Sequence, residues 1–235
     1  MTQQGLTELV FILDKSGSMA GLESDTIGGY NSFLDKQKQV EGEAKLTTVL
    51  FDNHYTLLHD RIDLRAVNPI TNRDYYVGGS TALIDAIGRT IDKIGNALAH
   101  TDEAYRPEKI LFVIITDGME NASREYRLEQ VRHMIEHQTE KYGWEFIFLG
   151  ANIDAIETAG HFGIRADRAQ NYHADSDGTG VSYLALYDAV ADFRSAPLAS
   201  VASALSNWGE RIERDYRSRG AGKRGRKTAD AGIKR

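Results

Sequence analysis

Hydrophobic runs long enough for buried strands alternate along the chain with segments of helical hydrophobic spacing. The clearest runs are residues 8–13, which end at Asp14, and residues 109–116, which end at Asp117. Continuous apolar runs of this length are typical of strands that helices cover on both faces. We therefore expect both runs in the interior of a mostly parallel sheet.

The remaining pattern predicts the rest of the sheet and its covering helices. Further strands are predicted over residues 45–51, 55–59, 144–149 and 169–173. Helical spacing predicts helices over residues 24–40, 82–98, 124–142, 153–162 and 180–193. Only three residues separate 45–51 from 55–59, which suits an antiparallel hairpin. The alternation predicts a doubly wound, Rossmann-like α/β fold whose mostly parallel sheet has one antiparallel strand.

The end of the chain differs from the rest in composition. The apolar pattern thins after Pro197, and residues 217–227 combine glycine with like charges and no large apolar side chain. Residues 210–235 carry a net charge of +6, whereas residues 1–209 carry −12. A segment with so little apolar surface is typical of disorder. We expect one folded domain over residues 1–207 and a basic, disordered tail over residues 208–235.

Composition narrows the class of protein. The 235 residues are 41% hydrophobic and 26% charged, as in ordinary globular proteins. There is no cysteine, which excludes disulfides, thiolate zinc sites and cysteine nucleophiles. The first residues lack a basic signal-peptide start, and the apolar run 110–115 is far shorter than the roughly 18 residues of a membrane span. We expect a cytoplasmic protein without a membrane partner.

Oxygen-bearing side chains follow the first predicted strand. Asp14, Ser16 and Ser18 alternate there with Lys15 and Gly17. If the chain stays extended beyond the strand, one carboxylate and two hydroxyls project to the same side. This edge, where parallel strands end, is where open α/β sheets bind ligands. Such hard oxygen donors favour Mg²⁺, Mn²⁺ or Ca²⁺ over zinc or copper.

Two further loops offer oxygens at the same predicted edge. Thr81 follows a glycine pair at the start of a predicted helix, and Asp117 closes the strand over residues 109–116. Because parallel strands end at one edge of a sheet, we expect the three loops to converge. The sequence thus predicts one divalent-metal site, formed by Asp14, Ser16, Ser18, Thr81 and Asp117.

Three short motifs around these residues resemble the von Willebrand factor A (vWA) domain family. They are FILDKSGSM at residues 11–19, GSTAL at residues 79–83 and ITDG at residues 115–118. In that family an Asp-x-Ser-x-Ser loop, a Thr and an Asp surround one cation in the metal-ion-dependent adhesion site (MIDAS), and all five positions match here. The resemblance spans roughly residues 6–195 and implies a stand-alone, intracellular member of bacterial type.

The resemblance also implies a role for each ligand. Ser16 and Ser18 would contact the metal directly, and Thr81 would do so directly or through water. Asp14 and Asp117 would act largely through water. With few direct carboxylates the cation keeps uncompensated positive charge, so a Glu or Asp of a partner protein can complete its octahedron.

The expected function is a non-enzymatic binding module that helps assemble an intracellular complex. Integrin-type relatives continue the first loop with acidic residues that build a second metal site, whereas Met19 and Ala20 follow here, so we expect one ion. A metal-dependent hydrolase or phosphotransferase is an alternative. The metal loops, however, lack a second Asp as nucleophile and a histidine as base, and the chain lacks a phosphate-binding loop.

The basic tail offers a second alternative. Clustered Lys and Arg over residues 217–235 would attract the phosphates of nucleic acid without sequence preference. The tail has no aromatic residue beyond Tyr216, so it has no platform for base stacking. A solubilising end, or an intramolecular partner for the acidic body, accounts for the same charges.

Several other polar motifs have structural interpretations. The Asp-Ser loop itself could be a helix-capping turn. His133 and His137 lie four residues apart on a predicted helix, but no third ligand is near in sequence, so we expect surface histidines. The acidic turn at Asp175 lacks the downstream Glu of a calcium loop and is expected to cap a helix. Asp85 and Asp154 either line the rim of the metal site or sit in helix first turns.

Overall fold

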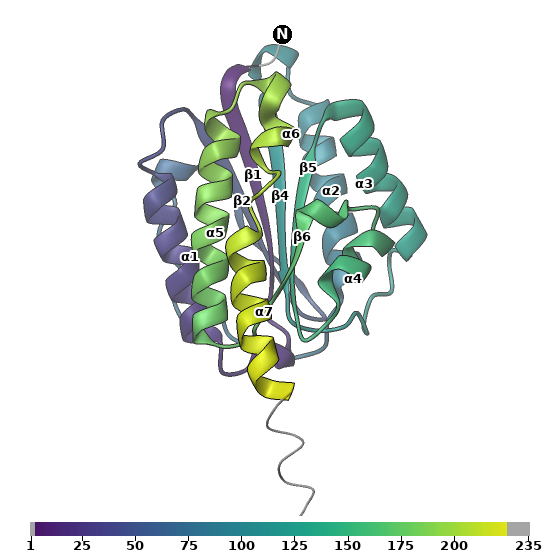
Figure 1. Ribbon diagram of the computed structural model, residues 1–235. Coiled ribbons are helices and arrows are strands. Elements are labelled where there is room, and N and C mark those ends of the chain that lie inside the picture. Colours follow the sequence, from purple (N-terminus) through teal and green to yellow (C-terminus); the bar gives the residue numbers. More distant parts are fainter. Residues whose placement is uncertain (1–2, 225–235) are drawn as a thin grey trace, which may run out of the picture.

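A single six-stranded sheet forms the centre of the computed structural model, which describes residues 3–224 (Figure 1). The strands are β1 (Gln3–Asp14), β2 (Ala44–Phe51), β3 (Tyr55–Asp63), β4 (Pro107–Thr116), β5 (Glu145–Ala151) and β6 (Ala169–Tyr172). Their order is β3-β2-β1-β4-β5-β6. Only β2 and β3 pair antiparallel, and the other neighbours are parallel. The predicted fold class is confirmed.

Helices cover both faces of this sheet (Figure 1). They are α1 (Glu23–Gln37), α2 (Leu83–Ala99), α3 (Leu128–Tyr142), α4 (Ala155–His161), α5 (Ser176–Ser195), α6 (Val201–Ala204) and α7 (Glu210–Arg224). Buried residues of α1, α5, α6 and α7 share one hydrophobic cluster, and those of α2, α3 and α4 share the other. No helix in the described part of the chain is long and apolar enough to cross a bilayer.

The apolar run of β1 supplies both clusters. Leu9, Phe11 and Leu13 face α1 and α5, whereas Val10 and Ile12 face the layer that contains α2. All five are at most 1% exposed. Side chains alternate between the two faces of a strand, so a strand covered on both sides needs apolar residues at every position. This requirement places β1 at the centre of the sheet, next to β2 and β4.

The expected disorder from residue 208 is wrong for Glu210–Arg224, which form α7. Trp208, just before the helix, and Ile212, in its first turn, are 7% and 1% exposed and join the cluster of α1 and α5. These two large apolar side chains anchor a segment whose other residues are mostly charged or glycine, because a helix buries only one stripe of its surface. The end of the predicted tail, residues 225–235, lies outside the described residues.

Candidate metal centre

The sheet brings the ends of its two central strands together. β1 and β4 are parallel neighbours in which Leu13 pairs with Ile115, so Asp14 and Asp117 both follow the same edge of the sheet. The loop before α2 joins them, because Gly17 N donates to Gly79 O at 3.1 Å and Gly78 N donates to Lys15 O at 2.9 Å. The three predicted loops therefore meet at one edge.

The three hydroxyl groups lie together. The Oγ atoms of Ser16 and Ser18 are 3.0 Å apart, and Thr81 Oγ1 donates to Ser16 Oγ at 3.0 Å. The loop is not extended throughout as expected, since residues Gly17–Met19 turn into a short 3-10 helix. This tight turn is what moves the Ser18 hydroxyl back toward Ser16.

Asp14 is fully buried and held at both carboxylate oxygens. Its Oδ1 accepts the Ser16 N–H at 2.7 Å, and its Oδ2 accepts the Thr116 hydroxyl at 2.6 Å. Burial raises the pKa of Asp14, and these hydrogen bonds offset part of the effect. Asp14 is thus oriented by its own loop and by the neighbouring strand.

Asp117 is also buried, but its carboxylate is unpaired. The residue is 1% exposed, and neither Oδ1 nor Oδ2 has a hydrogen-bond partner. Burial raises the pKa of Asp117 to about 6; the nearby Ser18 hydroxyl lowers it somewhat, and the Asp14 carboxylate raises it further. A buried charge without a partner is costly, so this carboxylate needs a cation beside it or a proton on it.

A divalent cation fits this donor set. The converging atoms are hydroxyl and carboxylate oxygens, the ligands that Mg²⁺, Mn²⁺ and Ca²⁺ prefer. Gly118 keeps the space open, because a Cβ at that position would lie 2.8 Å from Ser18 Oγ and 3.1 Å from Thr81 Oγ1. Within residues 3–224, no group of three or more His, Asp or Glu side chains is placed to hold a metal. The donor set of this site is therefore completed by hydroxyls rather than by further carboxylates.

Other residues that support the site were not identified from the sequence. Besides Thr116, they include Tyr75, whose hydroxyl donates to Asp14 O at 2.6 Å. Asn121 Oδ1 accepts the Thr81 N–H at 2.9 Å. Thr116 could have been noticed in the sequence, because its hydroxyl directly follows the apolar run 110–115. Tyr75 and Asn121 lie in loops without periodicity, and only the tertiary structure reveals their contacts.

Two acidic side chains secure the loop that follows β4. Asp85, in the first turn of α2, accepts backbone N–H groups of residues 124, 125 and 126. Glu120 accepts the backbone N–H groups of residues 84, 122 and 123 and the hydroxyl of Ser123. Asp85 therefore binds a loop rather than lining the metal rim. Together the two carboxylates fasten residues 120–126 to the start of α2.

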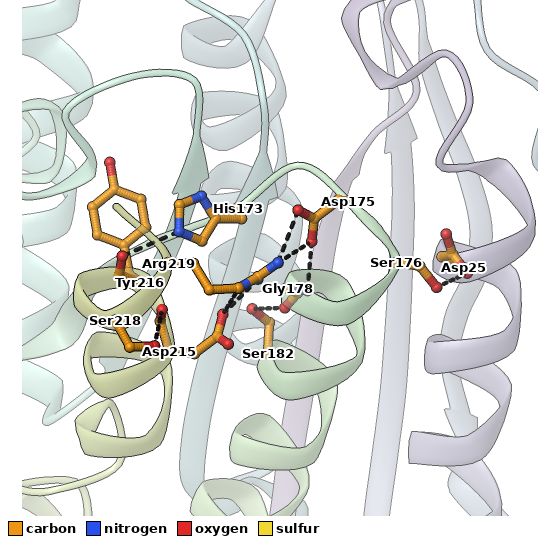
Figure 2. A network of polar contacts seen from close by, with 10 residues as sticks. All are labelled: Asp25, His173, Asp175, Ser176, Gly178, Ser182, Asp215, Tyr216, Ser218 and Arg219. Atoms are coloured by element: carbon orange, nitrogen blue, oxygen red, sulfur yellow. Dashed lines mark hydrogen bonds and ion pairs between the residues drawn. The ribbon is translucent and has the colours of Figure 1, made fainter. Parts of the chain in front are cut away.

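The remaining polar motifs have structural roles. Asp154 caps α4, and Asp175 caps α5 by accepting the Gly178 N–H at 2.9 Å. Figure 2 shows that Asp175 also binds Arg219 of α7, at 2.8 Å and 2.9 Å. His133 is 80% exposed and lies 3.6 Å from Glu136, and the His137 ring packs against Tyr142. The structural interpretations of these motifs hold.

Comparison with known proteins identifies the fold. No protein-family model matches the sequence, and no curated protein matches it. Among solved structures, the manganese-loaded TRAP protein of Plasmodium vivax is 17% identical, with a TM-score of 0.55 over 78% of this chain and 73% of that one. A von Willebrand factor type A protein from Catenulispora acidiphila is 14% identical, with a TM-score of 0.54 over 81% and 43%.

Proximal thread matrix protein 1 from the mussel byssus, solved with a zinc-occupied MIDAS motif, is 14% identical. Its TM-score is 0.55 over 80% of this chain and 46% of that one. This chain spans less than half the length of the mussel and Catenulispora proteins. At such identities the likeness concerns the fold, which is that of the vWA domain.

Proposed function

We propose that this chain is a divalent-metal-dependent protein-binding module. One cation, Mg²⁺ or alternatively Mn²⁺ or Ca²⁺, is held by Asp14, Ser16, Ser18, Thr81 and Asp117. The observation that carries the proposal is the Asp117 carboxylate, which is buried without a hydrogen-bond partner beside the Ser18 hydroxyl. The comparisons support it, because two proteins with the same fold have been solved with a divalent metal, one loaded with manganese and one with a zinc-occupied MIDAS motif.

The donor set favours capture of an acidic side chain. Ser16 and Ser18 would contact the cation directly, Thr81 would do so directly or through water, and Asp14 and Asp117 would bind it largely through water. Neutral hydroxyls leave most of the positive charge on the metal, so a carboxylate is the ligand it best accepts at a vacant position. A partner protein would supply that Glu or Asp, and the complex of the two proteins would form part of an intracellular assembly.

The surface around the site is accessible to a partner. Ser18 is exposed, and Met119, two residues after Asp117, is 75% exposed. An exposed large apolar side chain beside a polar centre is typical of interaction surfaces. Met119 would add apolar contact area next to the partner's carboxylate.

Metal binding at the proposed site is tested by titration. Mg²⁺ and Mn²⁺ are added to the wild type and to Asp14→Ala and Ser16→Ala, with calorimetry and thermal melts as readouts. Asp35→Ala and Ser32→Ala, both exposed on α1, are the matched controls. We expect binding by the wild type and the controls and loss of binding in the two site variants. Identical behaviour of all five proteins would refute the site.

Partner capture is tested separately. The chain is used to purify bound proteins with and without a chelator, and Asp14→Ala serves as a second metal-free condition. Proteins that depend on the metal should disappear from both the chelated sample and the variant. A partner set that neither treatment changes would mean that the metal does not mediate binding.

A further inference from the structure

A buried ion pair lies within the loop that carries the two serines. Lys15, between Asp14 and Ser16, is 4% exposed, and its Nζ donates to Asp52 Oδ2 at 2.5 Å. The same ammonium lies 4.8 Å from the centre of the Tyr76 ring. Asp52 belongs to the turn between β2 and β3. A positive charge is therefore held in place by a residue of the loop that carries two of the proposed metal ligands, Ser16 and Ser18.

Asp52 connects two of the metal-binding loops. Its carboxylate binds Lys15, in the serine loop, while its backbone oxygen accepts the Ala82 N–H at 2.9 Å, directly after Thr81. Its Oδ1 also accepts the His54 N–H at 2.5 Å. Burial raises the pKa of Asp52, but hydrogen bonds from Lys15 and His54 outweigh it, so the pKa lies below its usual range. Asp52 is thus an anion bound to the residues beside Ser16 and Thr81.

The charge of Asp52 matters because Lys15 and a divalent cation are both positive. Like charges repel strongly where water is scarce. A lone ammonium on a residue of the serine loop would raise the free energy of a divalent cation bound by the same loop. Asp52 cancels that charge at contact distance, and the pair is too buried for salt to screen it well. The cation then binds to the hydroxyls of a loop in which the charge of Lys15 is neutralised.

We propose that Asp52 is a positioning residue that sets the metal affinity of this site by neutralising Lys15. The inference rests on the proposed function, since it concerns the same cation. Asp52 makes no hydrogen bond or ion pair with the five proposed metal-binding side chains, so its effect is transmitted through Lys15 and the backbone at Ala82. Removal of the Asp52 charge should weaken metal binding, and removal of both charges should restore it.

The test is a double-mutant cycle read out as Mn²⁺ affinity. The proteins are the wild type, Asp52→Asn, Lys15→Met and the double variant, and the matched control is Asp60→Asn, which breaks the exposed ion pair of Asp60 with Lys93. Thermal melts in chelator report folding independently of the metal. We expect Asp52→Asn to bind about tenfold more weakly, which corresponds to about 1.4 kcal/mol, and the double variant to return to within about threefold of the wild type.

Each outcome decides between the explanations. A double variant as weak as Asp52→Asn would overturn the electrostatic role, because a merely structural pair is not restored by losing its second member. If Asp52→Asn does not fold, Lys15→Met decides, since the uncancelled Asp52 charge should then strengthen binding, and weaker binding would overturn the inference. If the wild type binds Mn²⁺ and the variants bind it equally well, this inference is refuted and the proposed function is not. Absence of wild-type binding refutes the proposed function and this inference with it.

Discussion

The Thr116 hydroxyl donates a hydrogen bond of 2.6 Å to Asp14 Oδ2, linking the last residues of β4 and β1. Both residues are fully buried. Because the neighbouring pair Leu13 and Ile115 is in register, the contact follows from strand pairing. Asp14 is therefore oriented by the centre of the sheet as well as by its own loop.

Replacing Thr116 with Val tests this contact. The shape of the side chain is kept, but Asp14 Oδ2 loses its donor, so we expect Mn²⁺ affinity to fall about tenfold. Metal-free stability should decrease by about 1–3 kcal/mol, the usual cost of leaving a buried acceptor unpaired. Calorimetry and denaturant unfolding measure the two quantities. Thr116→Ser keeps the hydroxyl and should retain wild-type affinity; equal losses in both variants would contradict the role of the hydrogen bond.

The buried Asp117 carboxylate predicts a pH dependence of metal-free stability. Its pKa is raised to about 6 from 3.8, so between these values the folded protein binds more protons than the unfolded chain. Stability contributed by this group is therefore highest at low pH and decreases as pH rises through about 6. The loss is at most about 3 kcal/mol. Chemical unfolding in chelator from pH 4 to pH 7 should show a smaller decrease for Asp117→Asn, and parallel curves would refute the prediction.

Gly118→Ala should obstruct the site without unfolding the protein. The added methyl would lie 2.8 Å from Ser18 Oγ, closer than Cβ atoms normally come to other atoms. We expect Ser18 to rotate away and Mn²⁺ binding to weaken at least about tenfold. Gly28→Ala is the matched control, because that glycine is exposed in α1 with open space around it. The control should bind normally and gain about 0.5–1 kcal/mol of stability.

The docking of α7 predicts that loss of this helix destabilises the domain. Trp208 is 7% exposed, and its Nε1 donates to Asp167 O at 3.0 Å. Trp208→Ala should therefore cost about 3 kcal/mol in unfolding experiments, whereas Tyr105→Ala, at a residue 66% exposed, should cost less than about 0.5 kcal/mol. A chain ending at residue 207 should therefore be less stable than the whole chain. Equal stability of these two chains would contradict the packing of α7.

The sequence was sufficient for the architecture because the central strands of the sheet are buried on both faces. Continuous apolar runs such as residues 9–13 have few interpretations other than a central strand, and the turn of three residues before Tyr55 predicted the antiparallel edge. The tail was misjudged because its apolar packing comes from two residues, Trp208 and Ile212, in or next to a charged segment. The average composition of the segment does not reveal packing by so few apolar residues.

For the candidate site, the sequence identified side chains that end strands or begin helices. Asp14 ends β1 and Asp117 follows β4, and the structure brings them together with Ser16, Ser18 and Thr81. Asp52 was not found, because it lies in a hairpin turn 37 positions from Lys15 and no periodicity relates them. Contacts of this kind depend on how loops fold over the sheet edge, which local sequence patterns do not encode.

The fastening of residues 120–126 by Asp85 and Glu120 has a consequence for binding kinetics. Much of the loop beside the proposed metal site is already ordered, so a partner need not organise it on arrival, and association should lack the entropy cost of folding a flexible segment. Encounter would then resemble the docking of two preformed surfaces. The lifetime of the complex would be set mainly by how readily the partner's carboxylate exchanges with water on the cation.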